Sequence, residues 1–147
     1  MHGESSPVRT RQSCDLLLSH EASGRYASVM TSVHHTFDYI ELAAPDLPAA
    51  VAFYSQAFGW SFNEYGGAYA GIRSADGDGE VGGLNPTAEA RPGGPLVLLF
   101  SDDLDASVQS VLQAGGEVAE EPYAFPGGRR FHFRDPAGNE LGVWSTS

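Results

Sequence analysis

A 57-residue internal repeat constrains the fold of this chain more than any other feature. The segment 46–51 (Asp-Leu-Pro-Ala-Ala-Val) recurs as segment 103–108 (Asp-Leu-Asp-Ala-Ser-Val), and Gly59 recurs as Gly116. A repeat of this length is typical of a duplicated supersecondary unit whose copies bury their apolar faces together. With 147 residues in total, the sequence predicts one domain made of two similar halves.

Each half predicts one helix that begins at an aspartate. Asp46 and Asp103 stand at N-cap positions, where a carboxylate accepts the free amide hydrogens of the first helical turn. Apolar residues then follow at helical spacing, namely Leu47, Val51, Tyr54 and Phe58 in the first half and Leu104, Val108, Val111 and Leu112 in the second. We expect Gly59 and the pair Gly115-Gly116 to end the two helices.

Short runs rich in strand-forming residues surround each helix, and turn-forming residues separate them. We expect strands over residues 39–44, 60–65, 69–74 and 80–85, and again over residues 96–101, 117–123, 129–134 and 140–145. The predicted fold is α+β. Two βαβββ modules, residues 37–85 and 95–145, pair into a curled mixed-sheet cup with one helix per module packed outside, and residues 86–94 link them.

The first 33 residues lack the periodicity of the rest. We interpret residues 1–33 as a disordered or mis-assigned leader, with Met30 as an alternative start, and residues 34–147 as the single domain. The segment fits neither a secretory signal nor a transit peptide, because it lacks a long apolar run and contains acidic residues. The only cysteine, Cys14, lies in it, which favours a cytoplasmic protein without disulfides.

The charge of the chain argues against two classes of partner. The chain has eight basic residues, all of them arginine, and nineteen acidic residues, which gives a net charge of −11. Nucleic acids and anionic membranes both attract clustered Lys and Arg, so neither is expected as a partner. No apolar run approaches the roughly twenty residues that span a bilayer. A small-molecule ligand remains the favoured partner.

Several segments, taken in order, resemble the vicinal oxygen chelate superfamily, which groups glyoxalase I, extradiol dioxygenases, fosfomycin-resistance enzymes and bleomycin-resistance proteins. They are residues 39–47 (Tyr-Ile-Glu-Leu-Ala-Ala-Pro-Asp-Leu), 53–54 (Phe-Tyr), 58–60 (Phe-Gly-Trp) and 133–141 (Phe-Arg-Asp-Pro-Ala-Gly-Asn-Glu-Leu). The resemblance covers residues 37–145. It implies paired βαβββ modules, frequent homodimers and, in many members, a divalent metal at the centre of the cup.

The residues that the resemblance makes candidate metal ligands are unsuited to that task here. Members usually supply a His on the first strand of each module and a Glu on the last. The His positions hold Tyr39 and Leu96, and aligning residues 80–84 with 140–144 places Gly82 and Gly142 at the Glu positions. Glycine and leucine side chains offer no donor to a divalent ion. We therefore expect no metal and no cofactor, and expect the two glycines to free volume for a ligand.

Strand alternation predicts the lining of the cup, because residues two apart share a face. The expected ligand-binding residues are Phe37, Tyr39, Glu41, Leu96, Leu98, Phe100, Arg130 and Trp144. Glu41 is the sharpest candidate, as a general base or as a partner for a cationic group, with an ordinary Arg ion pair as the alternative. His132 is a candidate proton shuttle or anion contact, against the alternative of a half-buried strand histidine. Arg73 and Arg130 could hold a ligand carboxylate.

Three motif-like stretches do not support other chemistry. His34-His35 with Asp38 lies at the start of a strand, where neighbouring side chains point apart. Residues 77–82 match the dinucleotide fingerprint by letter, but no helix follows and acidic residues would repel a pyrophosphate. Residues 76–87 lack the Gly and Glu that a calcium loop needs at its sixth and twelfth positions.

The leading hypothesis is a metal-free protein that binds a small, partly apolar molecule in the cup. Two alternatives stay open. One is an enzyme, a small lyase, isomerase or dioxygenase-like member that uses Glu41 with His132 as acid and base, or a metal held at a displaced site. The other is a purely structural dimerisation module. The resemblance also implies a homodimer.

Overall fold

The computed structural model describes residues 32–147 except residues 35 and 92. The interpretation of residues 1–31, including Cys14 and Met30, therefore lies outside the described residues. The first module contains β1 (Ile40–Ala43), α1 (Leu47–Phe58), β2 (Phe62–Glu64), β3 (Ala70–Arg73) and β4 (Glu80–Asn85). The second contains β5 (Val97–Phe100), α2 (Leu104–Gln113), β6 (Glu117–Phe125), β7 (Gly128–Arg134) and β8 (Glu140–Ser145).

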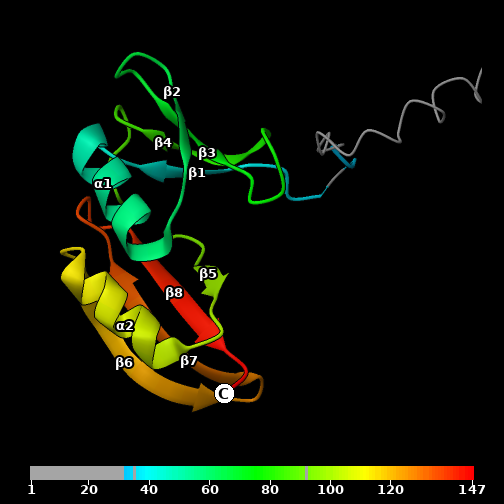
Figure 1. The fold of residues 1–147 in the computed structure, drawn as a ribbon, viewed down its shortest axis with the longest axis vertical. Coiled ribbons are helices and arrows are strands. Elements are labelled where there is room, and N and C mark those ends of the chain that lie inside the picture. Colours follow the sequence, from blue (N-terminus) through cyan, green and yellow to red (C-terminus); the bar gives the residue numbers. More distant parts are fainter. Residues whose placement is uncertain (1–31, 35, 92) are drawn as a thin grey trace, which may run out of the picture.

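The two modules repeat the same sheet topology. The strand orders are β1-β4-β3-β2 and β5-β8-β7-β6, and in each sheet the first pair is parallel and the others are antiparallel. Figure 1 shows the first module, in cyan and green, above the second, in yellow to red. The predicted α+β fold of two βαβββ modules with curled mixed sheets is confirmed.

Both helices begin as the sequence predicts. Asp46 accepts a hydrogen bond from the amide of Ala49 at 3.1 Å, and Asp103 accepts one from Ala106 at 3.0 Å. Each bond satisfies an amide that the helix itself leaves free. Gly59 ends α1 in the left-handed conformation with φ of 70°, where the absence of a Cβ removes the steric cost.

The modules share one apolar core, which lies on the helix side of both sheets. The ring of Phe133 in β7 lies 6.0 Å from Phe53 and 5.4 Å from Phe58, both in α1. The helices α1 and α2 also contact one another (Figure 1). Leu112 is 48% exposed, so the expectation that it belongs to the buried stripe of the second helix is wrong. The two apolar neighbours Leu104 and Val111 already fill the buried side of this helix.

Strand register corrects one expected equivalence between the modules. Glu41 pairs with Gly83, and its repeat partner Leu98 pairs with Gly142. Gly83, and not Gly82, is therefore the structural counterpart of Gly142. Gly82 faces the other way, since a Cβ there would meet the Ile40 carbonyl oxygen and the Ile72 side chain.

Candidate functional site

Because the core covers the helix side of each sheet, the opposite side of each sheet is left open, and most of the predicted site residues lie there. Tyr39 and Glu41 belong to the open side of the first sheet, which we call the module 1 face. Leu98, Phe100 and Trp144 belong to the open side of the second, which we call the module 2 face. Tyr39, Leu98 and Phe100 are 42%, 39% and 56% exposed. Phe37 precedes β1 and is fully exposed.

A β-bulge turns Glu80 onto the module 1 face. Ile72 pairs with Gly82 and Arg73 pairs with Glu80, so Val81 is an extra residue in β4. Without it, simple alternation would place Glu80 on the helix side together with Gly82. The bulge reverses this direction and adds a second carboxylate to the face that carries Glu41.

Tyrosine and asparagine side chains connect the two carboxylates. Glu80 accepts hydrogen bonds from Tyr65 at 2.6 Å and from Asn63 at 3.0 Å, both at Oε1. Glu41 accepts one from Tyr69 at 3.0 Å. It also accepts one from Asn85 at 2.7 Å. The phenol oxygens of Tyr39 and Tyr69 lie 2.8 Å apart and complete the connection.

A count of protons shows that this network is not fully saturated. Each phenol carries one proton. Tyr39 and Tyr69 therefore have two protons for three contacts: the one between their oxygens, the one from Tyr69 to Glu41 and the one from Tyr39 to Glu80. The contact from Tyr39 to Glu80 Oε2 is longer, at 3.4 Å. Glu80 Oε2 and the Tyr39 oxygen therefore keep acceptor capacity toward a donor group of a ligand.

The network shifts the protonation of its members in opposite directions. Hydrogen bonds from Tyr65, Asn63 and Tyr39 hold the pKa of Glu80 below its ordinary value. The pKa of Tyr69 is raised, mainly by desolvation and then by its bonds to Tyr39 and Glu41. Desolvation also raises the pKa of Tyr39. Near neutral pH, the module 1 face therefore combines an ionised Glu80 with protonated phenols.

Two glycines make room for this network. A Cβ at Gly83 would lie 1.8 Å from the Tyr69 hydroxyl, and a Cβ at Gly71 would lie 2.2 Å from the Glu80 carboxylate. Gly71 and Gly83 pair with one another across β3 and β4. Tyr69 and Glu80 therefore lie directly over bare backbone. The sequence analysis expected Gly82 to free volume for a ligand. On this face it is Gly83 that frees volume, and the Tyr69 side chain occupies that volume.

The module 2 face combines a cation with aromatic rings. The Arg130 Nε–H donates to the Tyr123 hydroxyl, and that hydroxyl lies 3.2 Å from His132 Nε2. The guanidinium carbon lies 5.1 Å from the Tyr123 ring centroid and 5.3 Å from that of Phe125. Trp144 contacts Phe100 and Phe125, with centroid distances of 5.1 and 6.2 Å. Arg130 and Trp144 are register partners, so the cation adjoins the rings.

The structure groups the predicted site residues by module. Glu41 joins Tyr39 on one face, and His132 joins Arg130 and Trp144 on the other. Within residues 32–147, apart from 35 and 92, no hydrogen bond or ring contact links Glu41 to His132. Arg73, the other arginine considered for ligand binding, instead pairs with Asp78 at 2.8 Å. The sequence analysis did not identify Asn63, Tyr65, Tyr69 or Glu80 as site residues.

The donor chemistry at the expected metal positions does not suit a divalent cation. With the corrected register, these positions hold Tyr39, Leu96, Gly83 and Gly142. Tyr69 fills the space over Gly83, and Leu98 fills it over Gly142, where a Cβ would lie 2.5 Å from Leu98 Cδ2. In the part of the chain that the structure describes, no three His, Cys, Asp or Glu side chains converge. The residues present therefore do not fit the metal site that the resemblance implies.

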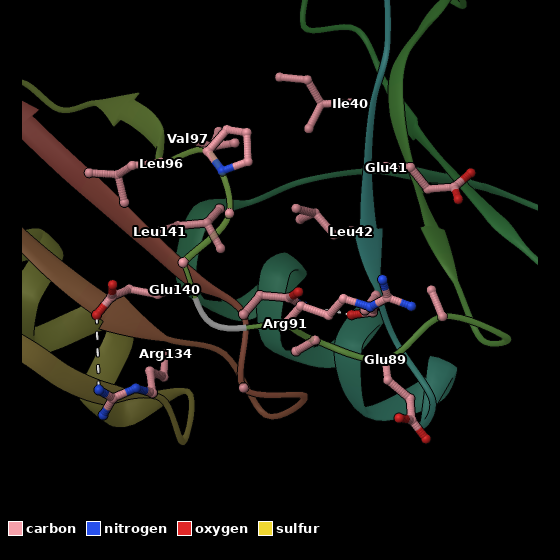
Figure 2. Close-up of a pocket in the computed structure, with 18 residues that line it drawn as sticks. Ile40, Glu41, Leu42, Glu89, Arg91, Leu96, Val97, Arg134, Glu140 and Leu141 are labelled. Carbon is pink, nitrogen blue, oxygen red and sulfur yellow. Dashed lines mark hydrogen bonds and ion pairs between the residues drawn. The ribbon is translucent and has the colours of Figure 1, made fainter.

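A groove of about 590 Å³ lies where the two modules meet. It is lined by β1, the linker and the beginnings of β5 and β8, and includes Glu41 and Leu96. Figure 2 shows the Ile40 and Leu42 side chains on one side of β1 and the Glu41 carboxylate on the other. The groove and the hydrogen-bonded network of Glu41 are therefore on different sides of this strand.

Comparison with known proteins agrees with this architecture. The family model of the Glyoxalase/Bleomycin resistance protein/Dioxygenase superfamily matches residues 36–143. The chain is 32% identical over 124 residues to the anthracycline biosynthesis protein DnrV of Streptomyces peucetius, covering 72% of this chain and 45% of that protein. It is 28% identical over 121 residues to the putative glyoxylase CFP32 of Mycobacterium tuberculosis, covering 76% of this chain and 46% of that protein.

The fold also matches a solved structure over nearly its full length. A glyoxalase/bleomycin resistance protein/dioxygenase family enzyme from Burkholderia phytofirmans superposes with a TM-score of 0.63 and 20% identity, covering 76% of this chain and 98% of that chain. The chain belongs to the glyoxalase/bleomycin resistance protein/dioxygenase superfamily. It spans less than half the length of the curated relatives that it matches. Neither described helix is long and apolar enough to cross a membrane.

Proposed function

We propose that this chain is a metal-free small-molecule-binding protein of the glyoxalase/bleomycin resistance type. The observation that carries the proposal is which residues stand at the four positions where the superfamily places metal ligands. Three of them lack a donor side chain, and Tyr69 and Leu98 occupy the space over the two glycines. A protein that needed a metal at this centre would keep donors there, whereas a binding protein can use the same surface for packing and hydrogen bonds.

The ligand lies between a polar and an apolar surface. The module 1 face offers Glu80 Oε2 and the Tyr39 oxygen as acceptors, which suits a donor or cationic group. Glu41 retains acceptor capacity as well, because its two hydrogen bonds use only part of its lone pairs. The module 2 face offers Leu98, Phe100 and Trp144 for the apolar part. Together they supply the few polar groups and the apolar lining of a small-molecule site.

A second copy of the chain closes the cup. Both faces are exposed in one chain, and they differ in chemistry: the module 1 face carries two carboxylates, and the module 2 face carries Arg130 and aromatic rings. A two-fold symmetric dimer can set the module 1 face of one chain against the module 2 face of the other and so form two equivalent cups. Sedimentation equilibrium at micromolar concentration tests this arrangement, with a dimer mass expected and a monomer mass contradicting it.

Native mass spectrometry of the purified protein tests the binding function. We expect a small organic molecule to travel with the folded protein and to dissociate on denaturation. Glu41→Gln should weaken its retention at least fivefold, because a charged acceptor is removed from the polar face. Glu64→Gln makes the same charge change at an exposed position of β2 outside the network, and should leave retention unchanged. Equal loss in both variants, or a stoichiometric metal with no organic ligand, contradicts the proposal.

The enzyme alternative is distinguished by the same variant. If Glu41 is a general base, Glu41→Gln abolishes turnover of the bound molecule while retention stays near the level of the unmodified chain. If Glu41 is a binding group, retention falls and the released molecule is chemically the same with and without the substitution.

A further inference from the structure

Arg130 differs from the other arginines that form the sheets. Arg73, Arg129 and Arg134 each pair with a carboxylate of the chain, at 2.8 Å for Arg73 to Asp78 and 3.4 Å for Arg129 to Asp105. Among the described residues, no carboxylate lies within ion-pair distance of Arg130. The chain has nineteen acidic residues, so the absence of an ion pair at Arg130 among the described residues does not reflect a shortage of carboxylates.

The side chain of Arg130 is nevertheless held in place. Its Nε–H donates to the Tyr123 hydroxyl, and its guanidinium lies over the rings of Tyr123 and Phe125. Contact with aromatic faces orients a guanidinium and stabilises it without neutralising its charge. Because Nε is occupied, the edge formed by the two terminal nitrogens stays available. That edge presents two parallel N–H donors, the geometry that a carboxylate accepts.

Flat apolar surface adjoins this edge. Trp144 is the cross-strand partner of Arg130, and Phe100 contacts the Trp144 ring edge to face. Phe100 is 56% exposed, so its ring is open to a ligand. A planar molecule can pack on these rings while a carboxylate attached to it reaches the guanidinium.

We propose that Arg130 and the neighbouring rings form a subsite for a planar aromatic carboxylate. The inference rests on the proposed binding function and adds the class of ligand. The opposite polar face excludes the carboxylate end, because Glu41 and Glu80 repel it, and so fixes the orientation of the ligand in the cup. Tyr123 acts as a positioning residue that aims the guanidinium.

Isothermal titration calorimetry with two matched probes tests the inference. The probe 2-naphthoate carries the carboxylate, and 2-naphthamide has the same ring system without the charge. We expect 2-naphthoate to bind at least tenfold more tightly than 2-naphthamide, since hydrogen bonds to charged groups contribute an effect of about that size or more. Arg130→Gln should remove this preference and leave the affinity for 2-naphthamide within twofold.

Arg129→Gln provides the matched control, because it removes the same charge from the adjacent residue, whose partner is Asp105. It should leave both affinities within twofold. Arg130→Lys keeps the charge but not the two parallel donors, and should give an intermediate affinity for 2-naphthoate. If Arg130→Gln does not fold, Tyr123→Phe serves in its place and should weaken 2-naphthoate binding selectively.

The outcomes separate this inference from the proposed function. Equal affinities of the two probes, or an equal loss of both on Arg130→Gln, overturn the carboxylate subsite while leaving an aromatic cup in place. Failure of both probes to bind overturns the subsite and counts against the apolar half of the cup as well. Selective loss of 2-naphthoate in Arg130→Gln, with Arg129→Gln unchanged, supports the subsite.

Discussion

The hydroxyl of Tyr54 donates a hydrogen bond of 2.8 Å to Asp135, and both side chains are buried. Tyr54 lies in α1 of the first module, and Asp135 lies in the turn between β7 and β8 of the second. The same carboxylate accepts from Asn139 Nδ2 at 2.7 Å, and Asn139 also donates to the Ala43 carbonyl oxygen at 2.6 Å. These hydrogen bonds therefore form one polar cluster that joins the two modules next to their shared apolar core.

We expect Tyr54→Phe to destabilise the protein by about 1–3 kcal/mol, because it removes a donor from a buried carboxylate oxygen. Urea unfolding followed by circular dichroism measures the change. Tyr65→Phe removes the same atom from an exposed side chain and should cost about 0.5 kcal/mol or less. Similar losses in the two variants would show that the cluster does not stabilise the junction.

Two adjacent glycines should respond differently to the same substitution. A Cβ at Gly82 would lie 2.2 Å from the Ile40 backbone oxygen, so Gly82→Ala forces β1 away from β4. We expect a cost of about 1–3 kcal/mol, as for other overpacked positions. A Cβ at Gly83 meets the end of the movable Tyr69 side chain, so Gly83→Ala should fold with a cost of about 1 kcal/mol or less.

Gly83→Ala should still disturb the site. Displacement of Tyr69 breaks its hydrogen bonds to Glu41 and Tyr39, and the carboxyl ¹³C resonance of Glu41 should shift. Gly82→Ala should shift the Glu41 resonance less than Gly83→Ala does, although it should cost more stability. The reverse ranking, with Gly83→Ala the less stable variant, would contradict the assigned register.

The protonation of Glu80 depends mainly on Tyr65. Hydrogen bonds from Tyr65, Asn63 and Tyr39 lower the pKa of Glu80 in the folded protein. Its ionisation therefore stabilises the fold above the ordinary glutamate pKa of about 4.3, and this contribution is lost as the pH falls through the lower folded-state pKa. Tyr65→Phe should raise the pKa toward the ordinary value in a carboxyl ¹³C titration. An unchanged titration curve would show that Tyr65 does not set it.

The sequence alone predicts the architecture well, because the signals are local and occur twice. Asp46 and Asp103 cap the two helices as expected, and Gly59 ends the first one. The strands β4 and β8 have the predicted bounds, residues 80–85 and 140–145. Capping and turn chemistry depend on residues a few positions apart, so one sequence is enough to find them.

The candidate site is less predictable, because one extra residue in a strand changes which side chains share a face. Strict alternation places Glu80 with Gly82 and away from Glu41. The bulge at Val81 reverses the direction of Glu80, and Gly83 takes the place expected for Gly82. Bulges arise from pairing with a distant strand and leave no clear local signal.

The tyrosine network is hard to predict from the sequence for a similar reason, because it depends on which strands are neighbours in the sheet. Tyr65 and Tyr69 meet Glu80 and Glu41 only because β2, β3, β4 and β1 lie side by side in the sheet. Gly71 and Gly83 gave a usable hint, since glycine inside a strand often marks a close approach by another group. Read in that way, the two glycines point to side chains that lie across the sheet.

The metal content of the purified chain tests the central claim most directly. Protein prepared without chelator should contain well under one equivalent of Mn, Fe, Co, Ni, Cu or Zn by inductively coupled plasma mass spectrometry, and prolonged treatment with EDTA should leave the binding of its co-purified ligand unchanged. One tightly held ion per chain, whose removal abolishes that binding, would contradict the account.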